Sequence, residues 1–91
     1  MTFSVHYAES VFKTQVEPLS PPERVEVDAH IKSLTTQPLP EQGSNRVIRL
    51  RDASAPVQPF FAGRTRRFMI FHTVEGDRVV ILGVFPARLR P

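Results

Sequence analysis

The fold is decided by residues 68–85, which read Phe68-Met69-Ile70-Phe71-His72-Thr73-Val74-Glu75-Gly76-Asp77-Arg78-Val79-Val80-Ile81-Leu82-Gly83-Val84-Phe85. Two apolar, β-favouring runs flank a short loop, Glu75-Gly76-Asp77. A glycine-containing loop of this length between two such runs is a strong signal for a β-hairpin. The second run is apolar on both sides, with Val79, Ile81 and Phe85 on one and Val80, Leu82 and Val84 on the other. We therefore predict that this run is a central strand.

Sheet is also predicted upstream of the hairpin. Residues 60–62 and 66–74 form apolar runs that are interrupted at Gly63-Arg64-Thr65. In residues 46–51, Ile48 and Leu50 share one side, which leaves Arg49 and Arg51 together on the other. Residues 36–45 and 52–59 are rich in helix- and strand-breaking residues, so both are predicted to be surface loops. The second half of the chain is therefore a meander of three or four antiparallel strands.

The first third of the chain predicts one strand and two helices. Residues 2–7 alternate polar and apolar side chains, as in a short strand. An apolar stripe at helical spacing follows, formed by Ala8, Val11, Phe12, Val16 and Leu19. Ser20-Pro21-Pro22-Glu23 then has the pattern of a capping box with proline in the first turn, so a second helix begins there. Residues 1–91 thus predict one α+β domain, a β-α-α unit followed by the meander, with both helices on one face of the sheet.

Size and composition limit the class of protein. A chain of 91 residues forms one small core. It contains no cysteine, and its longest apolar stretch is far shorter than the roughly 20 residues that cross a bilayer. The start, Met1-Thr2-Phe3-Ser4, has no basic segment typical of a secretory signal. We therefore expect a soluble, cytoplasmic protein, and the absence of a phosphate-binding glycine loop or of metal-ligand spacing predicts no cofactor and no metal.

Charge is divided unevenly along the chain. Residues 43–91 carry nine arginines and three acidic residues, a net charge of +6, whereas residues 1–42 carry −3. Such a basic half predicts binding to nucleic acid or to an acidic protein. The candidate nucleic-acid-binding residues are Arg49, Arg51, Arg64, Arg66, Arg67, Arg88 and Arg90. The alternative is a set of solvated charges that border a sheet.

The order of elements, the chain length and the last hairpin together resemble the RelE/ParE superfamily of bacterial toxins. The hairpin of residues 68–85 is similar to the family's last hairpin, and Arg88 falls where many members carry an arginine. The resemblance implies a toxin of a type II toxin–antitoxin pair that arrests growth by ribosome-dependent cleavage of mRNA. Two positions depart from the family pattern. Met69 stands where RNA-cleaving members have a phosphate-binding arginine, and the chain ends in Arg90-Pro91 where they often have a tyrosine or histidine.

Cleavage of RNA without a metal requires proton-transfer groups among fixed cations. The candidate catalytic residues are His72, Arg66, Arg67 and Arg88. His72 shares strand parity with Arg66, so it reaches substrate if that face is open and is a packing residue if the face is covered. His6 and His30 are expected to be structural or solvated. The five phenylalanines of the second half are assigned to the core, which argues against a general single-strand binder; they are Phe60, Phe61, Phe68, Phe71 and Phe85.

Three functions stay open at the level of sequence. The first is an mRNA-cleaving toxin, and the second is a ParE-like toxin that inhibits DNA gyrase without chemistry of its own. The third is an inactive basic binding module of the same fold. The resemblance implies a cognate antitoxin, part of which would be an acidic, flexible segment attracted by the basic half. A homodimer and a hetero-oligomer with the antitoxin are both compatible with the sequence.

Overall fold

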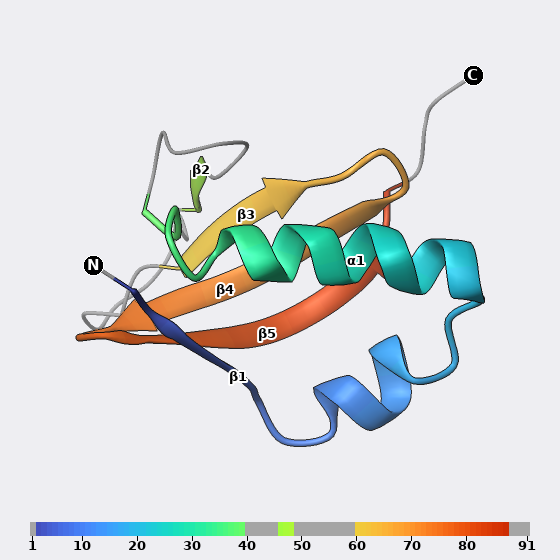
Figure 1. Ribbon diagram of the computed structural model, residues 1–91, viewed down its shortest axis with the longest axis horizontal. Coiled ribbons are helices and arrows are strands. Elements are labelled where there is room, and N and C mark those ends of the chain that lie inside the picture. The colour runs from blue at the N-terminus through green and yellow to red at the C-terminus, as the bar shows by residue number, and fades with distance from the viewer. Residues whose placement is uncertain (1, 40–45, 49–59, 88–91) are drawn as a thin grey trace.

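The computed structural model describes residues 2–39, 46–48 and 60–87, and only the backbone of residues 46–48 and of Phe60 (Figure 1). Its elements follow one another in the order β1 (Ser4–Tyr7), η1 (Phe12–Val16), α1 (Pro21–Ser33), β2 (Arg46–Ile48), β3 (Phe60–Arg64), β4 (Phe68–Glu75) and β5 (Arg78–Pro86). Here η1 is a short π-helical segment. No helix in the described ranges is long and apolar enough to cross a membrane.

The described strands form one mixed sheet with the order β1-β5-β4-β3-β2. Neighbouring strands from β2 to β5 are antiparallel, which confirms the predicted α+β class and the meander. β5 lies between β4 and β1, so its predicted central place is confirmed. The sequence did not predict that β1 pairs with β5 in parallel, with Ser4 opposite Arg78 and Tyr7 opposite Ile81.

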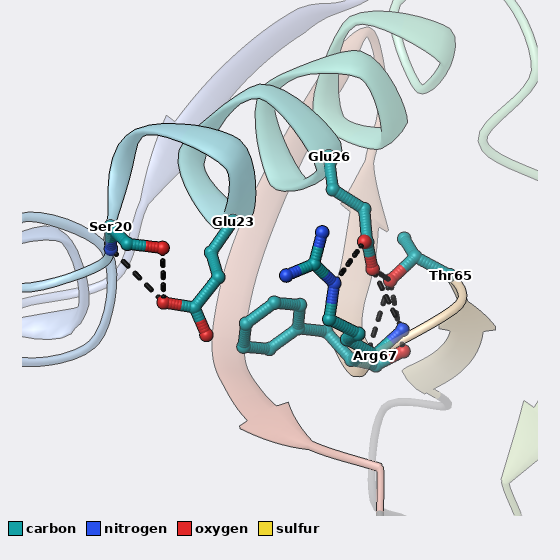
Figure 2. Close-up of polar contacts among 6 residues, drawn as sticks. Ser20, Glu23, Glu26, Thr65 and Arg67 are labelled. Carbon is teal, nitrogen blue, oxygen red and sulfur yellow. Dashed lines mark hydrogen bonds and ion pairs between the residues drawn. The ribbon is translucent and has the colours of Figure 1, made fainter.

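Helix α1 begins where the capping box predicts. The Glu23 carboxylate accepts hydrogen bonds from the backbone N–H of Ser20 at 3.0 Å and from its hydroxyl at 2.7 Å (Figure 2). Pro21 and Pro22 occupy the first turn, where a missing N–H costs nothing. Val27 and Leu34 are fully buried on the inner side of the helix. Figure 1 shows α1 lying across one face of the sheet.

The first predicted helix is much shorter than its apolar stripe suggests. Only Phe12–Val16 is helical in the π form, closed by a hydrogen bond of 2.8 Å from the Glu17 N–H to the Phe12 carbonyl. Pro18 lies just beyond this turn and lacks the N–H that a longer helix would need. The segment covers the edge of β5 past the end of β1, because the side-chain Oε1 of Gln15 accepts a hydrogen bond from the Val84 N–H at 2.6 Å.

Among the described residues, a core of buried side chains lies between the helices and one face of the sheet. It consists of Val11, Val16, Val27, Leu34, Phe68, Ile70, Val79, Ile81 and Val84. Both η1 and α1 contribute side chains to this cluster, so both pack on the same face, as the sequence predicts. We call this the helix face of the sheet and the other side the opposite face.

A bulge in β5 changes which side chains share a face. Phe71 pairs with Gly83 and His72 pairs with Ile81, which leaves Leu82 as an extra residue between them. Past the bulge, Val84 joins Ile81 on the helix face and is buried. Phe85 therefore turns to the opposite face, so the prediction that it shares a side with Ile81 is wrong.

Both hairpin turns differ from what the sequence indicates. The β4–β5 loop contains only Gly76 and Asp77, and Gly76 adopts a φ of 62°, which glycine reaches without a steric penalty. The predicted break at Gly63-Arg64-Thr65 is misplaced, because β3 continues through Arg64 and the chain turns after it. For the predicted strand at residues 46–51, residues 46–48 are confirmed as β2, and Arg49 and Arg51 lie outside the described residues.

Candidate functional site

The basic segment of the chain forms the turn between β3 and β4. The Thr65 N–H donates to the Phe68 carbonyl at 2.9 Å, and the Phe68 N–H donates to the Thr65 hydroxyl oxygen at 3.0 Å. These two bonds close a tight turn with Arg66 and Arg67 at its tip, where both are exposed. Two guanidinium groups are thus presented on ordered backbone.

Glu26 of α1 fastens this turn to the helix. Its carboxylate accepts the Arg67 backbone N–H at 2.7 Å, the Arg67 Nε–H at 3.0 Å, and the Thr65 hydroxyl (Figure 2). The Thr65 hydrogen bond is the largest cause of a lowered pKa of Glu26, and the hydrogen bonds from Arg67 lower it further against partial desolvation. Ala87 donates its N–H to the Arg67 carbonyl at 2.8 Å, so the end of the described chain is held at the same turn.

The three described arginines of this segment therefore have different roles. Arg67 is turned towards α1 and paired with Glu26. Arg66 is exposed and makes no hydrogen bond or ion pair to any described residue. Arg64 is exposed and pairs in register with Met69, so its side chain lies on the opposite face. The structure brings the three to one end of the sheet without placing them on one face, and Arg49, Arg51, Arg88 and Arg90 lie outside the described residues.

His72 lies on the helix face and has no exposed surface. Its Nε2 is 2.7 Å from the Pro38 carbonyl and donates to it, whereas the buried Nδ1 has no hydrogen-bond partner among the described residues. Burial lowers the pKa of His72, and the bond to Pro38 opposes this effect. The covered face favours the packing role that the sequence left open. The predicted parity with Arg66 does not apply, because the turn removes Arg66 from the strand.

The other two histidines differ in their surroundings. His30 of α1 is half-buried, and its pKa is lowered first by burial and then by the nearby His72. His6 of β1 is exposed on the opposite face, where its Nε2 lies 3.2 Å from the Ser4 hydroxyl oxygen. Within residues 2–39, 46–48 and 60–87, no three His, Asp or Glu side chains gather as they would around a metal ion.

An aromatic pair on the opposite face was missed by the sequence analysis. Phe71 and Phe85 contact each other edge to face with ring centroids 5.7 Å apart, and Phe85 is 46% exposed. The Phe85 ring lies over Gly83, where a Cβ would stand 2.4 Å from its Cε2. Of the five phenylalanines assigned to the core, Phe61 and Phe68 are buried, but Phe85 is not. The glycine within an apolar strand was the available signal, because such a glycine often marks a bulge or a close approach.

Comparison with known proteins gives a result at the level of structure alone. No protein-family model matches the sequence, and no curated protein sequence is similar to it. Among solved structures, the chain superposes on one in the crystal structure of the toxin–antitoxin complex RelBE2 from Mycobacterium tuberculosis. The TM-score is 0.75 at 18% identity, over 96% of this chain and 100% of the other. The protein has the RelE fold.

A second comparison agrees with this identification. The archaeal RelE–RelB complex from Pyrococcus horikoshii OT3 matches with a TM-score of 0.72 at 17% identity, over 94% of this chain and 96% of the other. The fold that the sequence resemblance implied is therefore confirmed.

Proposed function

We propose that this RelE-fold protein is the toxin of a type II toxin–antitoxin pair and that it arrests growth by cleaving mRNA on the ribosome. The observation that carries the toxin role is the match along nearly the whole chain to structures described as toxin–antitoxin complexes. The uneven charge supports a polyanionic target, because the arginines gather in the half of the chain that forms the meander.

The arrangement of Arg64 and Arg66 supports a role in cleavage. Met69 replaces a phosphate-binding arginine of the family, but Arg64 pairs with it directly across the sheet and offers a guanidinium at the neighbouring position. Guanidinium groups fixed beside a phosphate stabilise the charge that develops on it during cleavage. Arg66, at the tip of the turn, is available to contact the same phosphate. Arg67 would first have to break its ion pair with Glu26. The ribosome would contribute by holding the message in place.

Inducible expression in bacteria tests this proposal. RNA ends and plasmid supercoiling are mapped in the same cells after induction of the wild type, Arg66→Ala and Arg78→Ala. Arg78 is an exposed arginine at the far end of the β4–β5 hairpin, so its variant controls for loss of one positive charge. We expect growth arrest and new RNA ends from the wild type and Arg78→Ala, and much weaker arrest from Arg66→Ala. Arrest without new RNA ends would contradict the cleavage mechanism.

One observation favours a second candidate, a ParE-like inhibitor of DNA gyrase. The imidazole of His72 is buried away from the arginines, and the one described carboxylate beside them, Glu26, already accepts hydrogen bonds from Thr65 and Arg67. A toxin that only binds its target needs no proton-transfer group. In the same cells, relaxed plasmid together with intact RNA would identify gyrase as the target.

We also propose an antitoxin as the physiological partner, since both structural neighbours are complexes of a toxin with an antitoxin. The basic half of the chain would attract an acidic segment of that partner. Co-expression of the gene beside the toxin gene should restore growth and yield a complex on purification. Failure of every adjacent gene to restore growth would count against the pairing.

A further inference from the structure

The opposite face carries apolar groups that the fold does not require. Leu82 is 41% exposed and Phe85 is 46% exposed, although the core on the helix face is complete without them. Of the described helices, both pack on the helix face. A half-exposed phenylalanine near the end of β5 loses part of the stability that burial would give, so another role is expected for it.

The strand register sets these groups in two rows across the sheet. Arg64 of β3, Met69 of β4 and Phe85 of β5 form one row, because Arg64 pairs with Met69 and Met69 pairs with Phe85. Phe71 and Gly83 belong to the next row. The two aromatic rings thus lie diagonally on neighbouring strands, and the backbone of Arg64 lies two strand spacings, about 10 Å, from that of Phe85.

Two details keep the Phe85 ring in this place. The bulge at Leu82 turns Phe85 away from the helix face, and Gly83 leaves the space that the ring occupies. A Cβ at position 83 would lie 2.4 Å from Phe85 Cε2 and 2.9 Å from Cζ. The edge-to-face contact with Phe71 supports the ring from the adjacent strand.

We infer that Phe71 and Phe85 form a stacking platform for a base of single-stranded RNA, with Arg64 beside it for a phosphate of the same strand. Aromatic rings on neighbouring strands of a sheet, with helices on the other face and cations at the side, are how other sheet proteins bind unpaired bases. An apolar protein segment would also fit the rings, but Arg64 in the same row and the exposed Arg66 at the adjacent turn favour a polyanion. This inference rests on the proposed function, since it places the substrate of that site.

Fluorescence of an RNA containing 2-aminopurine tests the platform. Stacking quenches this base, so the full chain should quench it, and Phe85→Tyr should preserve both quenching and affinity because a ring remains. Phe85→Leu keeps an apolar side chain without a ring. It should weaken binding roughly 5- to 150-fold, the effect of losing one stacked base, and should abolish the quenching. Leu82→Ala, at an exposed apolar residue on the same strand, is the matched control and should bind as the wild type does.

The outcomes separate this inference from the proposed function. If the wild type does not quench the RNA, or if Phe85→Leu quenches it equally well, the platform does not exist. Weaker binding of the antitoxin to both Leu82→Ala and Phe85→Leu, with RNA binding unchanged, would assign the face to the protein partner and overturn the inference. Quenching by the wild type without new RNA ends in cells would instead uphold the platform and refute the cleavage mechanism.

Discussion

Both faces of the sheet carry large apolar side chains, but the two faces differ in how much of these side chains is exposed to solvent. On the helix face, Ile81 and Ile70 have no exposed surface, and the covering helices bring Val27 and Leu34 against them. On the opposite face, Leu82 and Phe85 remain more than 40% exposed. Apolar side chains on the helix face are fully buried and stabilise the fold, whereas those on the opposite face are half-exposed and contribute less to its stability. The comparison teaches that hydrophobicity alone does not identify the core of this chain.

The largest effect is expected when one apolar residue on each face of β5 is replaced by alanine and the two variants are compared. Ile81→Ala should lower the free energy of unfolding by about 2–5 kcal/mol, because it opens a cavity in the core. Leu82→Ala, at the adjacent residue, should lower it by no more than about 1 kcal/mol, because that side chain is partly solvated already. Urea denaturation followed by circular dichroism measures both. Equal losses would show that the opposite face is as well packed as the helix face.

A second test concerns the β3–β4 turn, which Glu26 binds to α1. Glu26→Ala removes the acceptor for Thr65 and for both donors of Arg67, and should cost about 1–3 kcal/mol of unfolding free energy. Because the pKa of Glu26 is lowered in the folded state, its contribution is complete above pH 4.5, the ordinary value, and falls as the pH drops through the folded pKa. The stability difference between wild type and variant should therefore shrink in acid. A difference that is the same at pH 7 and in acid would exclude the ionised carboxylate as its source.

A smaller effect is expected from His72 on the helix face and His30 on α1. Burial lowers the pKa of both His72 and His30 below 6.5, so the unfolded chain binds more protons than the folded chain as the pH falls past that value. Stability should therefore decrease from pH 7 towards pH 5. His72→Gln keeps a donor for the Pro38 carbonyl without a titrating group, so its unfolding free energy should depend less on pH. An unchanged slope in this variant would mean that His72 is hydrated and not buried.

The smallest effect is expected on the opposite face itself. Gly83→Ala places a methyl group against the Phe85 ring, which is half-exposed and can swing into solvent. The free energy of unfolding should change by less than about 1 kcal/mol. The Phe71 ring resonances should nevertheless shift in NMR spectra, because the Phe71–Phe85 contact is lost. A large loss of stability would show that Phe85 is held rigidly.

Local sequence signals predicted much of this structure. The Ser20–Glu23 capping box and the Gly76 turn depend on residues close together in the chain, so both could be predicted from the sequence. The bulge at Leu82 could not, because it arises from how β5 meets β4 and reverses the alternation that periodicity assumes. The parallel pairing of β1 with β5 joins segments more than 70 residues apart and has no local signature.

The candidate site was predicted only in part. The arginines were found because Arg64, Arg66 and Arg67 are clustered in the sequence, but the partner of Arg67 is Glu26 on α1, some 40 residues away. His72 resembles a reactive histidine in sequence, and only the packing of Phe61 and Pro38 around it shows that the imidazole is enclosed. The exposure of Phe85 depends on the bulge at Leu82, so the alternation of residues in the sequence could not predict it.

The position of β5 has a consequence for how a cell makes this protein. Of the described strands, β5 is the last to leave the ribosome, yet it lies between β4 and β1 in the sheet, and β1 is the first of the described strands to be synthesised. A nascent chain that stops before residue 78 lacks Val79, Ile81 and Val84, and so cannot close its core. Translation products that stop before residue 78 should therefore stay unfolded, and the chain can complete its fold only after β5 has left the ribosome.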